Sequence, residues 1–311
     1  MPTTLNGVQI SKMKYSNKIS LFIKRTAIFM VTLTVTLMGT LLSVSCNKKD
    51  TENKLTITKA ERIVVLCPSG AEILSTIGAE DHIVARTDYC DFPESLKQIP
   101  SIGGFSGDTL SIETILSYKP DFVYGSLGIH DTVKENLENL NIPVYLSETK
   151  DIEDILTEIE FMGTVTHHVE ESQSVTRQLR IQIKSLNKKK DKNNSVPDVY
   201  WEVWNAPFMS AGKKSFINDV INLAGGKNIF SDVEDVYPII SEEAILSRNP
   251  DVIIIPVENG ITINTLKKRA GWEQIKAVKN ESVIFIDSNL FTRPGPRIIQ
   301  AAEKLYDQLH K

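Results

Sequence analysis

Two segments far apart in the chain have nearly the same sequence, and this repeat limits the folds that the chain can adopt. Residues 113–121 read ETILSYKPD and residues 243–251 read EAILSRNPD, and each runs directly into an apolar stretch. Ile and Leu at helical spacing, followed by a proline, predict a short helix that ends just before a buried strand. One such αβ unit in each half predicts two similar lobes with a cleft between them.

The rest of the chain alternates in the same way. In the first half we expect strands at 62–67, 82–86, 121–125 and 142–146 and helices at 69–78, 111–118 and 131–140. In the second half we expect strands at 198–203, 251–255 and 282–286 and helices at 214–224, 242–248 and 296–309. Alternation of this kind predicts an α/β fold in which helices cover parallel sheets.

The segment between the two halves differs, because it has no strand signal. Ile155, Ile159 and Met162 recur at helical spacing, and Gly163 is expected to divide the segment into a shorter helix and a long one at 166–190. The sequence thus predicts two Rossmann-like lobes, 61–150 and 196–311, joined through connecting helices at 151–195 with a single long α-helix. A rigid helix resists the wide hinge closure that flexible crossover strands allow.

The N-terminal region looks like a bacterial lipoprotein signal. Basic residues precede an apolar run from Thr26 to Val44, and the small Ser45 comes directly before Cys46. We expect a signal peptide at 1–46, lipid chains on Cys46 that anchor the protein stably, and a polar tether at 47–60. A single transmembrane anchor is the alternative, and translation could start at Met1 or at Met13.

Two further cysteines, Cys67 and Cys90, each follow a predicted strand. A cell-envelope location permits disulfides, so the two could pair at one edge of the sheet. Two free, partly buried thiols are the simpler interpretation, and bond geometry cannot be read from the sequence.

Composition and motifs exclude other classes of protein. The net charge of −4 and the absence of a basic stripe with interleaved aromatic residues argue against a nucleic-acid partner. The Lys188–Lys190 run is expected to be a solvated helix end. There is no P-loop, no Gly-x-Ser-x-Gly elbow and no His-Glu-x-x-His motif, so we expect no enzyme activity.

Several segments together resemble a known family. They are RIVVLCPSGAE at 62–72, YCDFP at 89–93, the Gly103-Gly104 pair, both repeats and RPGPR at 293–297. This combination resembles the helical-backbone class of periplasmic substrate-binding proteins that feed ABC importers, over residues 61–310. YCDFP, YWEVWNAP at 200–207 and RPGP are most similar to the cobalamin-binding members. The resemblance implies a monomer in the cell envelope, facing the periplasm or the cell exterior, that carries cobalamin or a related corrinoid to an ABC permease dimer.

Aromatic residues in loops and at strand ends suit a large flat ligand, because such rings stack on a macrocycle. Trp201 and Trp204 lie on opposite faces of a strand, and we expect Trp204, next to the Asn-Ala-Pro turn, at the ligand. By the resemblance, Tyr89 matches a ligand-contacting tyrosine, and polar side chains could bond to corrin amides. The predicted ligand residues are Tyr89, Phe105, Trp204, Phe208, Tyr237, Asn289 and Arg293.

Glu113 and Glu243 open the two repeated helices, where the helix dipole favours a carboxylate, so simple capping is one interpretation. The resemblance implies another, in which matching glutamates on the outer surface of each lobe pair with arginines of the permease. We expect both to be docking residues.

A haem, ferric-siderophore or metal-ion receptor is the main alternative. A metal site would need several converging histidines and carboxylates, and we predict none. His130, in the loop after a strand, is the one histidine that could reach the cleft as an axial ligand to cobalt or haem iron. A surface lipoprotein that scavenges corrinoid for an outer-membrane transporter is the second alternative.

Overall fold

A computed structural model describes residues 59–192 and 195–311 of the chain, which belong to one compact unit. The predicted signal peptide at 1–46, the lipidated Cys46 and nearly all of the tether at 47–60 lie outside the described residues. Within the described ranges, no helix has both the length and the apolar character needed to cross a membrane.

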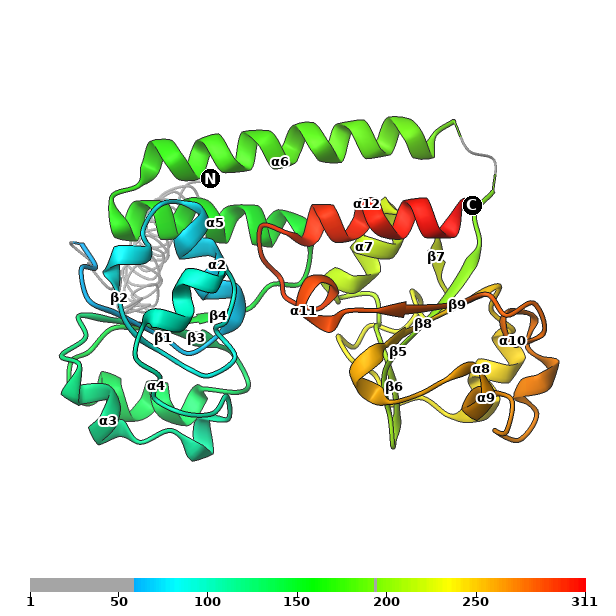
Figure 1. The fold of residues 1–311 in the computed structure, drawn as a ribbon, viewed down its shortest axis with the longest axis horizontal. Helices are drawn as coiled ribbons and strands as arrows, with labels where there is room; N and C mark the ends of the chain where they lie inside the picture. Colours follow the sequence, from blue (N-terminus) through cyan, green and yellow to red (C-terminus); the bar gives the residue numbers. More distant parts are fainter. Residues whose placement is uncertain (1–58, 193–194) are drawn as a thin grey trace, which may run out of the picture. The chain divides into compact units, whose positions relative to one another are not determined.

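The N-terminal lobe is built on a four-stranded parallel sheet with strand order β2-β1-β3-β4 (Figure 1). All three residues of β1 are buried, as expected of a strand covered by helices on both faces. The predicted helices and strands of this lobe are confirmed, with ends that shift by at most two residues. In chain order they are β1 (Ile63–Val65), α2 (Pro68–Thr76), β2 (Ile83–Arg86), α3 (Ile112–Ser117), β3 (Phe122–Ser126), α4 (Asp131–Glu138) and β4 (Val144–Ser147).

The C-terminal lobe repeats this topology, because its parallel strands lie in the order β7-β5-β8-β9. The additional strand β6 pairs antiparallel with the end of β5. The predicted elements are again found, whereas β6, β7 and the short helices α9 to α11 had not been predicted. The elements are β5 (Asp198–Asn205), β6 (Phe208–Ser210), α7 (Phe216–Leu223), β7 (Lys227–Asn228), α8 (Glu242–Arg248), β8 (Val252–Pro256), α9 (Ile263–Leu266), α10 (Lys276–Lys279), β9 (Val283–Ile286), α11 (Ser288–Phe291) and α12 (Ile298–Leu309).

The repeated αβ unit makes the same local contacts in both lobes. The Asp121 carboxylate accepts a hydrogen bond from the backbone N–H of Arg62 at 2.9 Å, at the start of β1. The Asp251 carboxylate accepts one from the backbone N–H of Asp198 at 3.0 Å, at the start of β5. In each lobe the last residue of the repeat thus ties its own strand to the central strand, which explains why this residue is Asp in both copies.

Two helices, α5 (Ile152–Thr166) and α6 (Val169–Lys190), connect the lobes, and α6 runs alongside both of them (Figure 1). The prediction that Gly163 ends the first helix is wrong. Helix α5 continues to Thr166, and the chain turns at His167, whose φ of 61° is left-handed. Gly163 instead lets the helices approach, because a Cβ atom there would lie 2.0 Å from Ser172 Oγ.

We expect Gly163→Ala to lower the free energy of unfolding by about 1–3 kcal/mol, because the added methyl group must push α5 and α6 apart. The new Cβ would also lie 2.8 Å from the backbone oxygen of His168, which cannot rotate away. Urea denaturation measures the change. Thr164→Ala, at an exposed position of the same helix, is the control and should shift stability by less than about 0.5 kcal/mol. Equal stabilities of the two variants would contradict the packing role.

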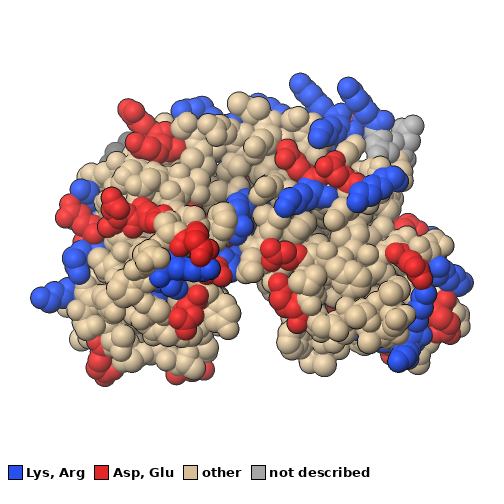
Figure 2. All heavy atoms as spheres, in the orientation of Figure 1, with Lys and Arg blue, Asp and Glu red and all other residues tan. Residues whose placement is uncertain are grey.

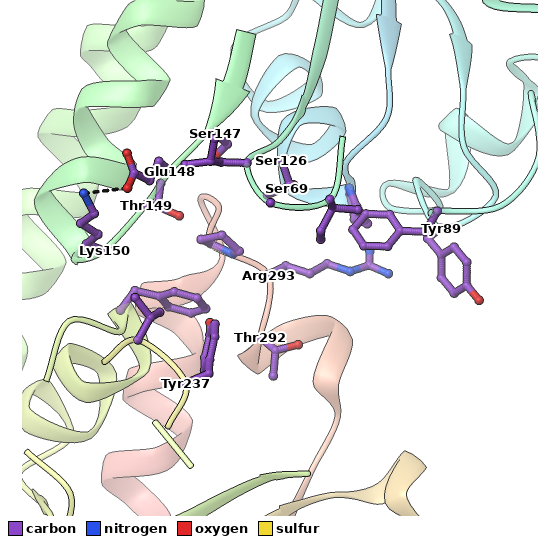
Figure 3. A pocket seen from close by; sticks show the side chains of 18 of the residues that line it. Ser69, Tyr89, Ser126, Ser147, Glu148, Thr149, Lys150, Tyr237, Thr292 and Arg293 are labelled. Atoms are coloured by element: carbon purple, nitrogen blue, oxygen red, sulfur yellow. Dashed lines mark ion pairs between the residues drawn. The ribbon is translucent and has the colours of Figure 1, made fainter. Parts of the chain in front are cut away.

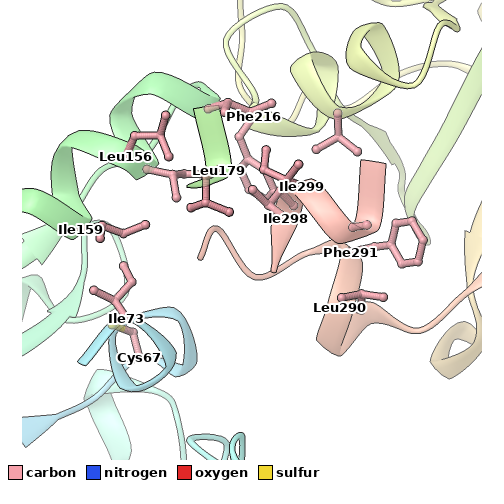
Figure 4. Close-up of a cluster of buried hydrophobic side chains, with 14 of the residues drawn as sticks. Cys67, Ile73, Leu156, Ile159, Leu179, Phe216, Leu290, Phe291, Ile298 and Ile299 are labelled. Atoms are coloured by element: carbon pink, nitrogen blue, oxygen red, sulfur yellow. The ribbon is translucent and has the colours of Figure 1, made fainter. Parts of the chain in front are cut away.

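One apolar core continues from lobe to lobe. It includes β1 and α2 of the first lobe, both connecting helices, and α7 and α12 of the second lobe. Figure 4 shows Leu156 and Ile159 of α5 in this cluster, together with Ile73, Phe216 and Ile298. A wide hinge motion would have to separate these buried side chains, so the shared core adds to the stiffness expected from the connecting helix.

Candidate ligand-binding site

A pocket of about 620 Å³ lies between the two lobes. The surface is hollowed between the lobes on the side away from α6 (Figure 2). At the end of α6 itself, Lys188 and Lys189 are exposed, as predicted for a solvated helix end. The pocket is lined where parallel strands of the N-terminal lobe end, which is where ligands bind in open α/β sheets. Its lining residues are Pro68, Ser69, Tyr89, Phe105, 126–129, 147–150, Phe216, Val236, Tyr237, Ser288, Asn289 and 292–294.

Five of the predicted ligand residues line this pocket: Tyr89, Phe105, Tyr237, Asn289 and Arg293. Figure 3 shows Tyr89, Tyr237 and Arg293 around the cavity. The rings of Tyr89 and Phe105 meet edge to face, with centroids 6.0 Å apart, at the wall formed by the N-terminal lobe. Tyr237 contributes an aromatic ring from the other lobe. The structure therefore brings aromatic surface and polar side chains from both lobes to one cavity.

The structure does not bring Trp204 and Phe208 to the pocket lining. Phe208 lies on the unpredicted strand β6. It is partly buried, and its ring stacks on Trp272, a buried core residue of the C-terminal lobe, with centroids 5.8 Å apart. Trp204 is 52% exposed near the end of β5, and its indole N–H donates to the backbone oxygen of Ala206 at 3.0 Å. Trp201 is fully buried, as expected of a packing residue.

Sequence reasoning missed the lining residues that follow β3 and β4. Ser126 to Ile129 and Ser147 to Lys150 supply hydroxyl groups and two exposed apolar side chains, Leu127 and Ile129. Both segments begin at the carboxyl end of a predicted parallel strand. The topological position of these segments would have identified them, although their residue types alone would not.

The charged side chains of the pocket lining are all paired with opposite charges. Lys150 Nζ lies 2.8 Å from the Glu148 carboxylate. Arg293 lies 2.8 Å from the Asp91 carboxylate and 3.4 Å from that of Glu72. The described lining therefore offers a ligand no uncompensated charge, and hydrogen bonds and apolar contact remain as its means of recognition.

His130 cannot serve as the axial metal ligand considered from the sequence. Its ring is buried, Nδ1 accepts a hydrogen bond from the backbone N–H of Ser126, and Nε2 bonds to the backbone oxygen of Phe105, both at 2.9 Å. Because a backbone N–H only donates, Nδ1 is unprotonated and Nε2 carries the hydrogen. Burial lowers the pKa of His130, so the neutral ring is favoured. Across the described ranges, no group of three His, Cys, Asp or Glu side chains could hold a metal ion.

Cys67 and Cys90 are free, buried thiols and do not form the disulfide that the sequence had left open. Cys90 Sγ lies 3.3 Å from Thr87 Oγ1 and 3.8 Å from the backbone oxygen of Val65. Burial raises the pKa of both thiols, that of Cys90 to about 11. Both therefore remain protonated and unreactive at neutral pH.

Glu113 and Glu243 occupy equivalent, exposed positions in the first turns of α3 and α8. Serine side chains cap both helices, because Ser111 and Ser241 each accept a hydrogen bond from the backbone N–H three residues later. Capping therefore does not require either glutamate. The Glu113 carboxylate also accepts a 2.9 Å bond from Ser111, and hydrogen bonds lower its pKa, so it is ionised.

Two α/β lobes with a shared core and an aromatic-lined pocket between them define a two-lobed ligand-binding protein. A family model described as periplasmic binding protein matches residues 63–290, and the chain belongs to this family. It is 27% identical over 279 residues to the uncharacterized ABC transporter substrate-binding lipoprotein YvrC of Bacillus subtilis (strain 168), a match that covers 84% of both chains.

Two solved structures share the fold and more than a quarter of the aligned residues. The periplasmic vitamin B12 binding protein BtuF of Vibrio cholerae is 28% identical, with a TM-score of 0.69, over 80% of this chain and 96% of that one. A possible iron-binding (periplasmic solute-binding) protein from Staphylococcus epidermidis ATCC 12228 is 27% identical, with a TM-score of 0.72, over 81% of this chain and 100% of that one. The protein is thus a substrate-binding protein of an ABC transporter, which confirms the family and fold class inferred from its sequence.

Proposed function

We propose that the interlobe pocket binds cobalamin or a closely related corrinoid and that the protein delivers it to an ABC permease. The observation that carries this proposal is a pocket with aromatic rings from both lobes whose charged side chains are all paired. A corrin is a large macrocycle edged by neutral amides, so it needs stacking surface and hydrogen bonds rather than a free charge.

Each proposed ligand residue has a role in this arrangement. Tyr89, Phe105 and Tyr237 supply stacking surface, and Asn289 and Arg293 supply polar groups at the edge. A corrinoid is larger than the 620 Å³ pocket, so part of it extends outward, and the exposed ring of Trp204 is the proposed contact for that part. Phe208 is not included, because its ring is packed against Trp272.

Haem is the second candidate ligand, and one observation favours it. Tyr89 and Tyr237 carry phenol groups at the pocket, and a tyrosine oxygen is an established axial ligand of haem iron. The paired charges of the lining argue against it, because haem propionates, like many ferric siderophores, are anionic and gain from a free cation.

Isothermal titration of the purified protein with cyanocobalamin, with haemin as the paired ligand, tests the proposed function. We expect tight one-to-one binding of cyanocobalamin and weak binding of haemin. Tight haemin binding that Tyr89→Phe or Tyr237→Phe abolishes would replace the corrinoid by haem. Binding of neither would reject both and leave ferric siderophores as the class to titrate.

We also propose how the protein is held and how it docks. Its similarity to a named lipoprotein supports a signal peptide at 1–46, a lipid anchor on Cys46 and a tether at 47–60 that keep the binding unit at the cell envelope. The equivalent exposed positions of Glu113 and Glu243 support docking of one lobe to each subunit of a permease dimer. A surface scavenger of corrinoid would not need these two carboxylates.

A further inference from the structure

A buried carboxylate ties the two lobes together beside the pocket. Glu72, in α2 of the N-terminal lobe, is 2% exposed. Its carboxylate accepts hydrogen bonds from Arg297 at 2.8 and 2.5 Å and from Arg293 at 3.4 Å. Both arginines belong to the C-terminal lobe, more than 200 residues later in the chain, so each of these contacts crosses from one lobe to the other.

Two further N-terminal residues complete this connection. The Asp91 carboxylate accepts a 2.8 Å hydrogen bond from Arg293, and the Arg297 guanidinium lies over the ring of Phe92, 3.6 Å from its centroid. Two arginines thus face two carboxylates and one aromatic ring. The charges balance, and the planar Arg297 guanidinium is held on two sides.

The connection continues into the pocket through Arg293. Its Nη2 atom donates to the side chain of Asn289 at 2.5 Å. Because a guanidinium group only donates, the Asn289 atom that faces it is the amide oxygen. Asn289 lines the pocket, and its amide nitrogen donates no hydrogen bond to any residue that the structure describes. These N–H groups are therefore available to an acceptor in the pocket.

We propose that Glu72 is a positioning residue for ligand binding. From the N-terminal lobe it holds Arg293, and through Arg293 it fixes the amide of Asn289 so that the N–H groups donate to a neutral carbonyl oxygen of the ligand. Asp91 shares the hold on Arg293, so that this arginine is compensated and does not attract an anion. The ligand in this inference is the corrinoid of the proposed function, whose edge amides carry such carbonyl groups.

The test compares Glu72→Gln with a matched control in the purified protein. The control is Glu202→Gln, because Glu202 is fully buried and binds Arg269 through two hydrogen bonds of 2.6 and 2.9 Å, entirely within the C-terminal lobe and outside the pocket lining. Titration with cyanocobalamin, under conditions in which circular dichroism shows every variant folded, should give a Kd about 10- to 100-fold weaker for Glu72→Gln. The control should stay within about threefold of wild type.

A double-mutant cycle separates positioning from general destabilisation. If Glu72 acts through Asn289, then Glu72→Gln should add little to the loss of affinity caused by Asn289→Ala. Asp91→Asn, at a side chain that is 40% exposed, is the second variant if Glu72→Gln does not fold, and it should show the same non-additivity. Additive losses, or an equal loss in Glu202→Gln, would overturn the proposal.

Failure of the proposed function is distinguishable from failure of this inference. If wild type binds haemin and not cyanocobalamin, the corrinoid is wrong, and the same cycle measured with haemin still decides the role of Glu72. Hydrogen exchange without ligand provides a further measure: residues 90–92 and 293–297 should exchange faster in Glu72→Gln than in Glu202→Gln. Equal exchange in the two variants would show that Glu72 does not hold these segments.

Discussion

Glu113→Ala combined with Glu243→Ala is expected to reduce uptake of the transported ligand by about tenfold or more while leaving its affinity for the protein unchanged. Both carboxylates are exposed at equivalent positions of the two lobes, and neither lines the pocket. Serines cap both helices, so the substitutions should not unfold them. Uptake of labelled cobalamin by cells, paired with titration of the purified variant, measures the two effects separately.

The matched control removes the same charge from the same kind of position. Glu170 and Glu171 lie exposed in the first turn of α6, the connecting helix, and their double alanine variant should retain normal uptake. Each single variant at Glu113 or Glu243 should give an intermediate loss, because one lobe can still dock. A loss of ligand affinity in the Glu113 and Glu243 variant, or an equal loss of uptake in the control, would contradict the docking role.

The fold was predictable because its signals are local. Strands buried on both faces appear in the sequence as apolar runs, as in β1 and β8. The repeated αβ unit predicted the second lobe. The strand β7 has two residues and β6 has three, too few for a periodic pattern, and their pairing with β5 depends on tertiary contacts. The error at Phe208 follows directly, because β6 places its ring against Trp272 at the edge of the core and away from the pocket.

The candidate site was predicted in part for the same reason. Tyr89, Tyr237 and Arg293 lie in loops between the helices and strands, and the sequence indicates where such loops fall. His130 is engaged by a hydrogen bond to Phe105, 25 residues away, and Glu72 by hydrogen bonds from arginines in the other lobe. Such long-range pairs leave no periodic trace, so a single sequence gives no indication that these side chains are already engaged.

Glu158 is another side chain whose environment the sequence did not indicate. It is 3% exposed in α5, where the Tyr124 hydroxyl donates to its carboxylate at 2.6 Å and the Ser147 hydroxyl at 2.9 Å. Burial raises the pKa of Glu158 from 4.5 to about 7, because the two hydrogen bonds offset only part of the lost hydration, and the negative charge of Asp154 raises it further. At neutral pH this carboxyl is therefore near its midpoint of ionisation.

This pKa shift predicts a specific pH dependence of stability. Between pH 4.5 and about 7 the folded protein binds a proton at Glu158 that the unfolded chain has released, so stability falls as pH rises through this window. The difference between a pKa of 4.5 in the unfolded chain and about 7 in the folded protein corresponds to about 3 kcal/mol. Glu158→Gln cannot titrate and should lack this loss. Urea denaturation of both proteins from pH 4 to 8 should show the variant gaining about 3 kcal/mol relative to wild type across the window.

Glu153→Gln provides the control on the same helix, because it makes the same chemical change at an exposed residue. Glu153 pairs with Arg180 at the surface, and this hydrogen bond lowers its pKa, so its contribution has the opposite sign and is lost as pH falls. An exposed pair contributes less than about 1 kcal/mol, so Glu153→Gln should keep nearly the whole wild-type decline between pH 4.5 and 7. A parallel stability profile for wild type and Glu158→Gln would show that the buried carboxyl stays ionised in the folded protein, held by Tyr124 and Ser147 more strongly than burial opposes it.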